Sequence, residues 1–90
     1  MDWIDEILAD APTEDEQMLS AIETYFTTGE VHGDFLRNLM SNDFARTVTC
    51  ADAHNSEFIH EWAIWVWNSV PMSSWGSPQK VEDFEGISDL

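Results

Sequence analysis

The sequence predicts an all-α fold, a compact bundle of five or six short helices around a Trp-rich central helix at about residues 54–68. Apolar residues recur at helical spacing along most of the 90-residue chain, and no segment of useful length has the alternation of a strand. Hydrophobic residues make up 43% of the chain and include five Trp, so the chain can bury a core and general disorder is excluded. This length predicts one acidic helical domain, residues 1–90.

The first two helices are expected in the N-terminal third of the chain. Residues 1–12 are predicted to form an acidic amphipathic helix that Asp2 caps and Pro12 ends. Thr13–Glu16 has the form of a capping box and predicts a second helix, which Gly29 ends. The apolar stripe of the first helix consists of Trp3, Ile4, Ile7 and Leu8.

Polar capping residues begin the helices in the middle of the chain. Asp34 is predicted to cap a short helix, and Ser41–Asp43 is predicted to end it and cap the next one. The β-branched residues 47–49 weaken that helix, so its end is not fixed by the pattern. Asp52 is then predicted to begin the longest helix, which runs to about Asn68.

Proline and glycine set the ends of the last two helices. Pro71 ends the longest helix, because proline disfavours the helical conformation of the residue before it. Ser77 and Pro78 form an N-cap followed by proline at the first helical position, and Gly86 is predicted to close this last short helix. Residues 86–90 are expected to form a short tail.

The longest helix is apolar around its whole circumference. At about 100° per residue, most of its apolar residues share one broad face, whereas Ile64 and Trp67 lie nearly opposite. A helix of this kind is buried on all sides. The sequence leaves two interpretations open: a central core helix, or a helix that also contacts a second copy in a homodimer.

The formal charge of −15 is concentrated toward the two ends of the chain. Residues 1–16 carry seven acids and no base, residues 17–80 carry seven acids and all three bases, and residues 81–90 carry four acids. These segments contribute −7, −4 and −4. Self-repulsion of this size disfavours a compact state, so the charge indicates either solubility in salt or a surface that binds a partner.

Several classes of function are disfavoured. Three cations are too few to neutralise phosphates, so direct nucleic-acid binding is not expected. No apolar run approaches the ~20 residues of a membrane span, and a lone Cys50, expected to be buried, fits a cytoplasmic protein. Phosphate loops and metal motifs are missing from the sequence, so no enzymatic activity, cofactor or metal is expected. The candidate ligands of the central helix are interpreted as solvated charges: His54, Glu57, His60 and Glu61.

The acids themselves are the main functional signal. Carboxylates at i,i+3 and i,i+4 on a helix lie about 5–6 Å apart at Cβ, close to the spacing of phosphates along a strand. Such rows predict a DNA mimic that binds the basic surface of a nucleic-acid-binding host protein or complex. The predicted contact residues are Asp2, Asp5, Glu6, Asp10, Glu14, Asp15 and Glu16. If the two chain ends meet in space, a second acidic patch is predicted, which consists of Glu82, Asp83 and Glu85.

The alternative is a protein–protein adaptor or a homo-oligomeric accessory protein that uses apolar contacts. Its candidate residues are Trp3, Trp65, Trp67 and Trp75. The first segment has two interpretations as well, since it can dock on a partner's groove or cover this protein's own core.

The stretch Gly33–Arg46 (Gly-Asp-Phe-Leu-Arg-Asn-Leu-Met-Ser-Asn-Asp-Phe-Ala-Arg) resembles part of a family of small phage-encoded helical proteins. Members have a Gly-x-Phe-Leu-x-x-(Leu/Val)-(Leu/Met)-x-Asn-Asp segment, an Ala-Asp and Asn corner, an aromatic-Asn-x-x-Pro turn, and a Trp-Gly-Ser followed by Val. The resemblance covers about Gly29–Phe84. The later matches are Ala51-Asp52, Asn55, Trp67–Pro71, Trp75–Ser77 and Val81.

The resemblance implies a phage or prophage origin and a helical fold, and it implies no activity because the family has no settled biochemical role. Residues 1–16 lie outside the family pattern, which makes them the candidates for a task particular to this member. In size and charge the chain also resembles the anti-restriction and anti-CRISPR inhibitors that imitate DNA. The expected function is therefore a phage-type inhibitor of a host defence complex, acting in the host cytoplasm.

Overall fold

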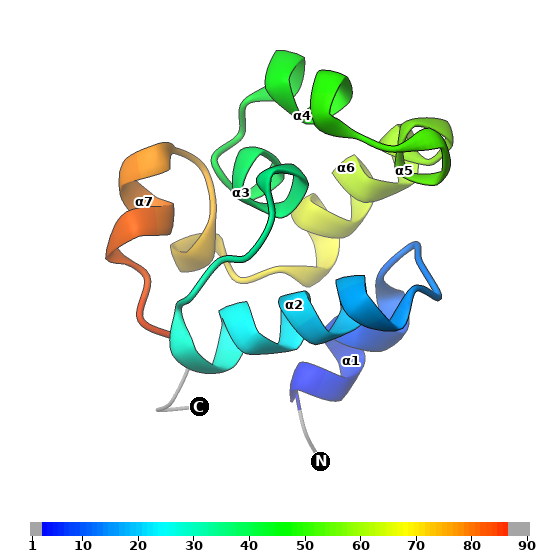
Figure 1. Ribbon diagram of the computed structural model, residues 1–90. Helices are drawn as coiled ribbons and strands as arrows, with labels where there is room; N and C mark the ends of the chain where they lie inside the picture. The colour runs from blue at the N-terminus through cyan, green and yellow to red at the C-terminus, as the bar shows by residue number, and fades with distance from the viewer. Residues whose placement is uncertain (1–2, 87–90) are drawn as a thin grey trace.

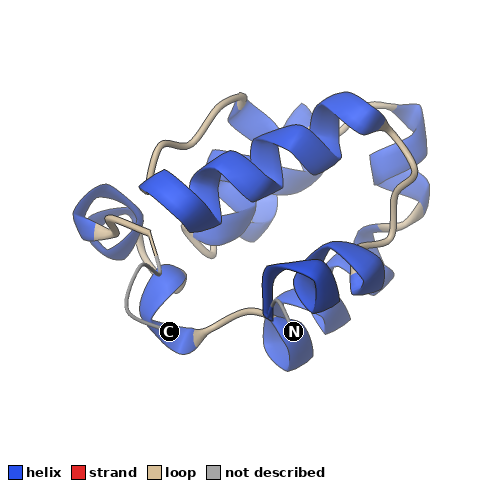
Figure 2. Ribbon diagram, turned by 90° about the horizontal axis from the view of Figure 1, so that it is seen from below, coloured by secondary structure: helices blue, strands red, loops and turns tan. Residues whose placement is uncertain are grey.

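A computed structural model describes residues 3–86, apart from the side chain of Trp3 (Figure 1). Over these residues the chain is all-helical, as the sequence predicts, and Figure 2 shows only helices and loops. The predicted cap Asp2 and most of the predicted tail lie outside the described residues. The elements are α1 (Trp3–Asp10), α2 (Glu16–Thr28), α3 (Asp34–Met40), α4 (Phe44–Cys50), α5 (Ala53–Glu57), α6 (Ile59–Ser69), the 3-10 helix η1 (Met72–Ser74) and α7 (Pro78–Asp83).

Most predicted helix boundaries are set by the expected residues. The side chain of Asp43 accepts a hydrogen bond from Arg46 N at 3.1 Å, and that of Asp52 accepts one from Asn55 N at 2.8 Å. Ser77 caps α7 in the same way. Gly29 ends α2 in the left-handed conformation, with φ at 85°.

Three boundaries differ from the prediction. The cap of α2 is Asp15, whose side chain accepts from Gln17 N, whereas Thr13 accepts a hydrogen bond from Asp15 N and lies outside the helix. Asp34 is the first residue of α3, and Gly33 occupies the cap position. The last helix ends at Asp83, and Gly86 instead lies against the end of α2.

The predicted long helix is broken at Phe58. This residue has φ −108° and ψ 25°, and its N–H is shared between the carbonyls of His54 and Asn55 at 3.2 Å each. The break separates α5 from α6, and across it the buried Asn55 accepts a hydrogen bond from Trp62 Nε1 at 3.2 Å. No glycine or proline marks this position, so the sequence carries no signal of the break.

Aromatic residues of α2, α3 and α6 fill the core. Trp62 is fully buried and makes edge contacts with Phe35 and Trp65, with ring centroids 5.4 and 5.3 Å apart. Helix α1 packs on α2 and α6, whereas α3 packs on α4 and α7. Tyr25 is fully buried and donates a hydrogen bond to the Ser74 carbonyl at 2.5 Å, which joins α2 to η1. Helix α6 is therefore central, as predicted.

Candidate interaction surfaces

The N-terminal acids lie on α1 and on the turn that leads into α2. Asp5 and Glu6 are in the first turn of α1, Asp10 is its last residue, and all are exposed. We call this set the acidic edge, and it consists of Asp5, Glu6, Asp10, Glu14, Asp15 and Glu16. Asp2, also predicted here, lies outside the described residues.

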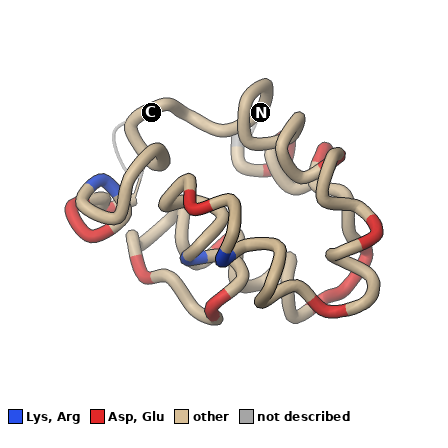
Figure 3. Tube along the Cα trace, turned by 90° about the horizontal axis from the view of Figure 1, so that it is seen from above, with Lys and Arg blue, Asp and Glu red and all other residues tan. Residues whose placement is uncertain are grey.

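The carboxylates of the acidic edge are not neutralised by the protein itself. In the described part of the chain, Arg46 pairs with Asp43 at 3.6 Å, His32 lies 3.6 Å from Glu30, and neither contact involves the edge. The first base in the sequence is Arg37. Figure 3 shows acids and no base along the trace near the N-terminus. The edge is therefore available to a cationic partner.

The second acidic set, on and after α7, does not extend this edge. Glu82, Asp83 and Glu85 are exposed, but α7 packs on α3 and η1, whereas α1 packs on α2 and α6. Figures 1 and 3 place the two helices on opposite sides of the molecule. The acids of the two chain ends therefore form separate surfaces.

The four tryptophans of the alternative contact set do not share one surface. The structure corrects the expectation for Trp65, which is 2% exposed and donates a hydrogen bond from Nε1 to the Ile7 carbonyl at 2.9 Å. This bond holds α1 on α6 and leaves Trp65 inaccessible to a partner. Trp67 is 74% exposed and Trp75 is partly buried beside it. Trp3 begins α1, and its side chain is outside the described part.

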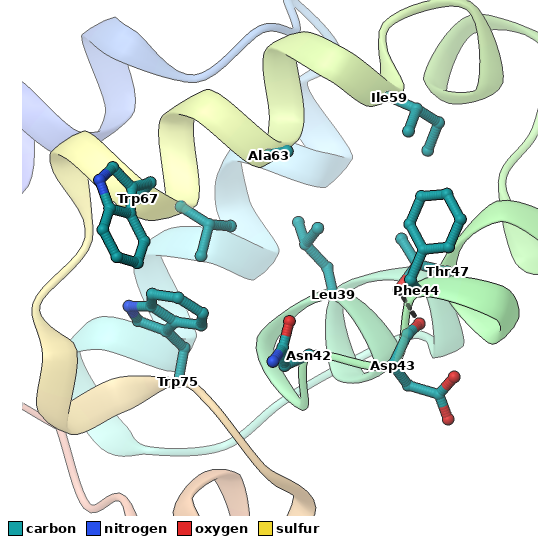
Figure 4. Close-up of a pocket in the computed structure, with 10 residues that line it drawn as sticks. Leu39, Asn42, Asp43, Phe44, Thr47, Ile59, Ala63, Trp67 and Trp75 are labelled. Carbon is teal, nitrogen blue, oxygen red and sulfur yellow. Dashed lines mark hydrogen bonds between the residues drawn. The ribbon is translucent and has the colours of Figure 1, made fainter.

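An apolar groove opens between α6 on one side and α3 and α4 on the other. Its volume is about 330 Å³. Figure 4 shows Trp67 and Trp75 at one end and Phe44 with Ile59 at the other. Phe44, like Trp67, is 74% exposed. We call this feature the aromatic groove, and it is lined by Leu39, Asn42, Asp43, Phe44, Thr47, Ile59, Ala63, Val66, Trp67 and Trp75.

The Trp67–Trp75 pair closes one end of the aromatic groove. The two rings make an edge contact, with centroids 6.1 Å apart and planes at 70°. Trp75 Nε1 is buried and has no hydrogen-bond acceptor among the described residues. In Figure 4 this nitrogen lies on the side of the ring that faces Trp67. The exposed Trp67 ring therefore shields an unused donor.

The acidic edge, on α1 and the turn into α2, and the aromatic groove lie on opposite sides of α6. Two residues of a helix that are two positions apart differ by about 200° in direction, as Trp65 and Trp67 do. The Trp65 face contacts Ile7, and the nearby Ser69 Oγ donates to the Asp10 carboxylate at 3.2 Å. The Trp67 face lines the groove. A partner at one surface thus leaves the other surface free.

Few side chains in the described structure are suited to catalysis or metal binding. Cys50, expected to be buried, is exposed, and its sulfur accepts a hydrogen bond from Asn38 Nδ2 at 3.4 Å. Between residues 3 and 86 no three His, Cys, Asp or Glu side chains gather closely enough to hold a metal ion. Burial raises the pKa of Tyr25 from 10.0 to about 12. The two surfaces above are therefore the candidate functional sites.

The fold and these surfaces define a small, acidic, all-α protein with an acidic edge and an aromatic groove. Comparison with protein-family models, with curated proteins and with solved structures finds no match. None of the helices within residues 3–86 has the length and apolarity needed to cross a bilayer.

Sequence reasoning missed most of the aromatic groove. Phe44 follows the predicted cap Asp43, and an exposed aromatic residue directly after a cap carries no periodic signal. The one available signal was the apolar far side of the central helix, from which Ile64 and Trp67 were expected to lie opposite the core face. They are 45% and 74% exposed. Of the two, only Trp67 lines the groove, and what lies opposite it there depends on how α3 and α4 pack.

Proposed function

We propose that this protein is a non-enzymatic inhibitor that binds, through the acidic edge, the basic surface of a nucleic-acid-binding host defence complex. It acts as a DNA mimic of the anti-restriction or anti-CRISPR kind, and is phage-encoded. The observation that carries the proposal is that the edge carboxylates are exposed and form no ion pair within residues 3–86. A cationic surface gains attraction from such groups without first breaking internal pairs.

The arrangement of the edge also supports mimicry. Asp5, Glu6 and Asp10 lie on one rigid helix, held to α6 by the Trp65–Ile7 hydrogen bond. The helix fixes the relative positions of these residues before binding, so little backbone conformational entropy is lost on association. A surface that evolved to contact DNA, with about one charge per 1.7 Å of duplex axis, offers matching cations.

The test is inhibition of DNA cleavage by a panel of restriction endonucleases and CRISPR effector complexes. For a target that is inhibited, inhibition should weaken steeply as salt rises from about 50 to about 200 mM, as it does for DNA binding. Asp5→Asn with Glu6→Gln removes two exposed contacts worth ~0.2–1 kcal/mol each, so affinity should fall about 2- to 30-fold. Inhibition that does not change with salt contradicts the mechanism.

The matched control removes the same charge from the other side of the molecule. Glu82→Gln with Glu85→Gln changes the net charge by the same two units on and after α7. We expect this variant to keep most of its affinity, because α7 is remote from the edge. Equal losses in both variants would show that only the net charge matters and that the acidic edge is not the site.

The second candidate function, an adaptor or homo-oligomer that uses apolar contacts, is favoured by one observation. The aromatic groove exposes Phe44 and Trp67, each 74% accessible, beside an apolar cavity. In this case Trp67→Ala would abolish partner binding, whereas the amide substitutions at Asp5 and Glu6 would have little effect.

A further inference from the structure

The charge of this protein is separated between two parts of the fold. The aromatic groove is lined by α3, α4, α6 and the loops next to them, within residues 34–50 and 59–77. These segments contain two bases, Arg37 and Arg46, and three acids, Asp34, Asp43 and Glu61, which gives a net charge of −1. The rest of the chain contains fifteen acids and one base, for a charge of −14 and a total of −15. The elements that form the groove are therefore close to neutral.

This neutrality limits what can occupy the groove. A basic partner is attracted to the segments that carry −14 and gains little from groove elements at −1. An acidic partner is repelled unless the face that it brings to the groove is itself near neutral. A second copy of this chain has such a face, because its own groove elements carry Arg37 and Arg46 with Asp34, Asp43 and Glu61.

The shape of the groove also suits a second copy. A two-fold interface requires one face to be complementary to itself. The groove side carries a cavity of about 330 Å³ and, at its two ends, the protruding rings of Phe44 and Trp67 (Figure 4). Each copy thus offers both a cavity and the aromatic rings to cover one.

We propose that a second copy of this chain occupies the aromatic groove. The two copies pack groove to groove about a two-fold axis, and Phe44 and Trp67 of each copy cover the groove of the other. The acidic edges lie on the opposite face of α6 and point away from the contact. The dimer does not depend on the proposed inhibitory function, which uses that other face.

The exposed aromatic area is compatible with a weak, reversible dimer. An aromatic side chain buries about 150–250 Å², so 74% exposure leaves about 150 Å² on each ring. Four such rings supply about 600 Å², which is about half of the ~1,200 Å² at the lower end of specific protein–protein interfaces, so the dimer is expected to be weak.

Salt gives this dimer a distinctive signature. Two chains of −15 repel each other, and the repulsion weakens as the screening length falls from about 20–30 Å near 0.02 M salt to below 10 Å near 0.3 M. The contact itself is apolar and is not weakened by salt. Dimerisation should therefore strengthen with salt, whereas binding through the acidic edge should weaken.

Sedimentation equilibrium at about 10–200 μM protein, in about 0.02 and 0.3 M NaCl, tests the proposal, since weak dimers dissociate in the micromolar range. We expect a monomer–dimer equilibrium with more dimer at high salt. Phe44→Ala with Trp67→Ala should weaken it at least about tenfold, a loss of about 1.4 kcal/mol. Phe44→Ala alone should weaken the dimer in the same direction and keep its melting temperature, because this side chain is 74% exposed, whereas Trp67→Ala also removes a contact with Trp75. The control Asp5→Asn with Glu6→Gln should dimerise at least as well as the unmodified protein.

Indole N–H signals in NMR spectra locate the contact. The Trp67 and Trp75 signals should move with protein concentration, whereas those of Trp62 and Trp65, which are hydrogen-bonded in the core, should stay fixed. A chain that is monomeric at both salt concentrations overturns the proposal. A dimer that survives both alanine substitutions, or that weakens with salt, also overturns it.

Discussion

Replacing Tyr25 by Phe tests the connection between α2 and η1. The hydroxyl of this fully buried side chain donates to the Ser74 carbonyl at 2.5 Å, and the ring packs on Phe26 and Phe84 with centroids 5.2 and 4.8 Å apart. Phenylalanine keeps the ring contacts and removes the donor, which leaves a buried carbonyl without this partner. Such a loss costs about 1–3 kcal/mol. For 90 residues the unfolding entropy is about 190 cal/mol/K, so the melting temperature should fall by about 5–15 °C.

The same substitution has a pH signature. Burial raises the pKa of Tyr25 from 10.0 to about 12. Between these values the unfolded chain loses the phenol proton while the folded chain keeps it, so the unfolded state binds fewer protons and stability falls as pH rises. The part of the unfolding free energy that depends on this pKa difference is fully present below pH 10 and is lost as pH rises toward 12. A shift of about two units corresponds to about 2.7 kcal/mol.

The assay is urea unfolding of the unmodified protein and of Tyr25→Phe at a series of pH values from neutral to alkaline. Tyr25 is the single tyrosine, so the variant lacks this titration while other groups titrate in both proteins. The difference in unfolding free energy should therefore shrink as pH rises above 10. Tyrosinate absorbance of the folded protein gives the pKa directly. A difference under about 0.5 kcal/mol at neutral pH, or one that stays constant through this range, would refute the reasoning.

Two further substitutions test the packing around α2 and α6. Trp65→Phe removes the indole donor to the Ile7 carbonyl and should lower the unfolding free energy by about 1–3 kcal/mol. Hydrogen exchange measured by mass spectrometry should then be faster at the amides of α1. Unchanged exchange would show that this bond does not hold the helix. Gly29→Ala places a Cβ against the backbone of Phe84 and Glu85 at a φ of 85°. It should therefore lower the unfolding free energy by more than the ~1 kcal/mol that a strained turn alone costs, and so lower the melting temperature. An unchanged melting curve would contradict the close packing.

Local signals in the sequence were enough to predict the helices and most of their ends. Asp43, Asp52 and Ser77 cap helices because a short polar side chain reaches the backbone N–H two or three residues on, a contact that needs no tertiary structure. The break at Phe58 could not be predicted, because neither glycine nor proline marks it in the sequence. The boundary of α2 was misplaced because two competing caps lie two residues apart.

The candidate surfaces were predicted unequally for a related physical reason. Charge is a property of the sequence, and charged side chains are rarely buried without a partner, so exposure of the acidic edge followed from composition. The helical pattern already places Trp67 opposite the broad apolar face, and only the assignment of Trp65 to the same contact set is wrong. Their roles differ because α1 covers one face of α6 and leaves the other open.

Helix α6 relates the two surfaces to one another. A helix that is apolar all round needs partners on every side, and within the described chain α1 and Phe26 of α2 contact the Trp65 side while the Trp67 side remains exposed. The segments that form the groove carry −1 of the total charge of −15, so the repulsion between two copies is weakest on that side. On these grounds salt should act in opposite directions on the two surfaces, so a single salt series separates inhibition through the edge from dimerisation through the groove.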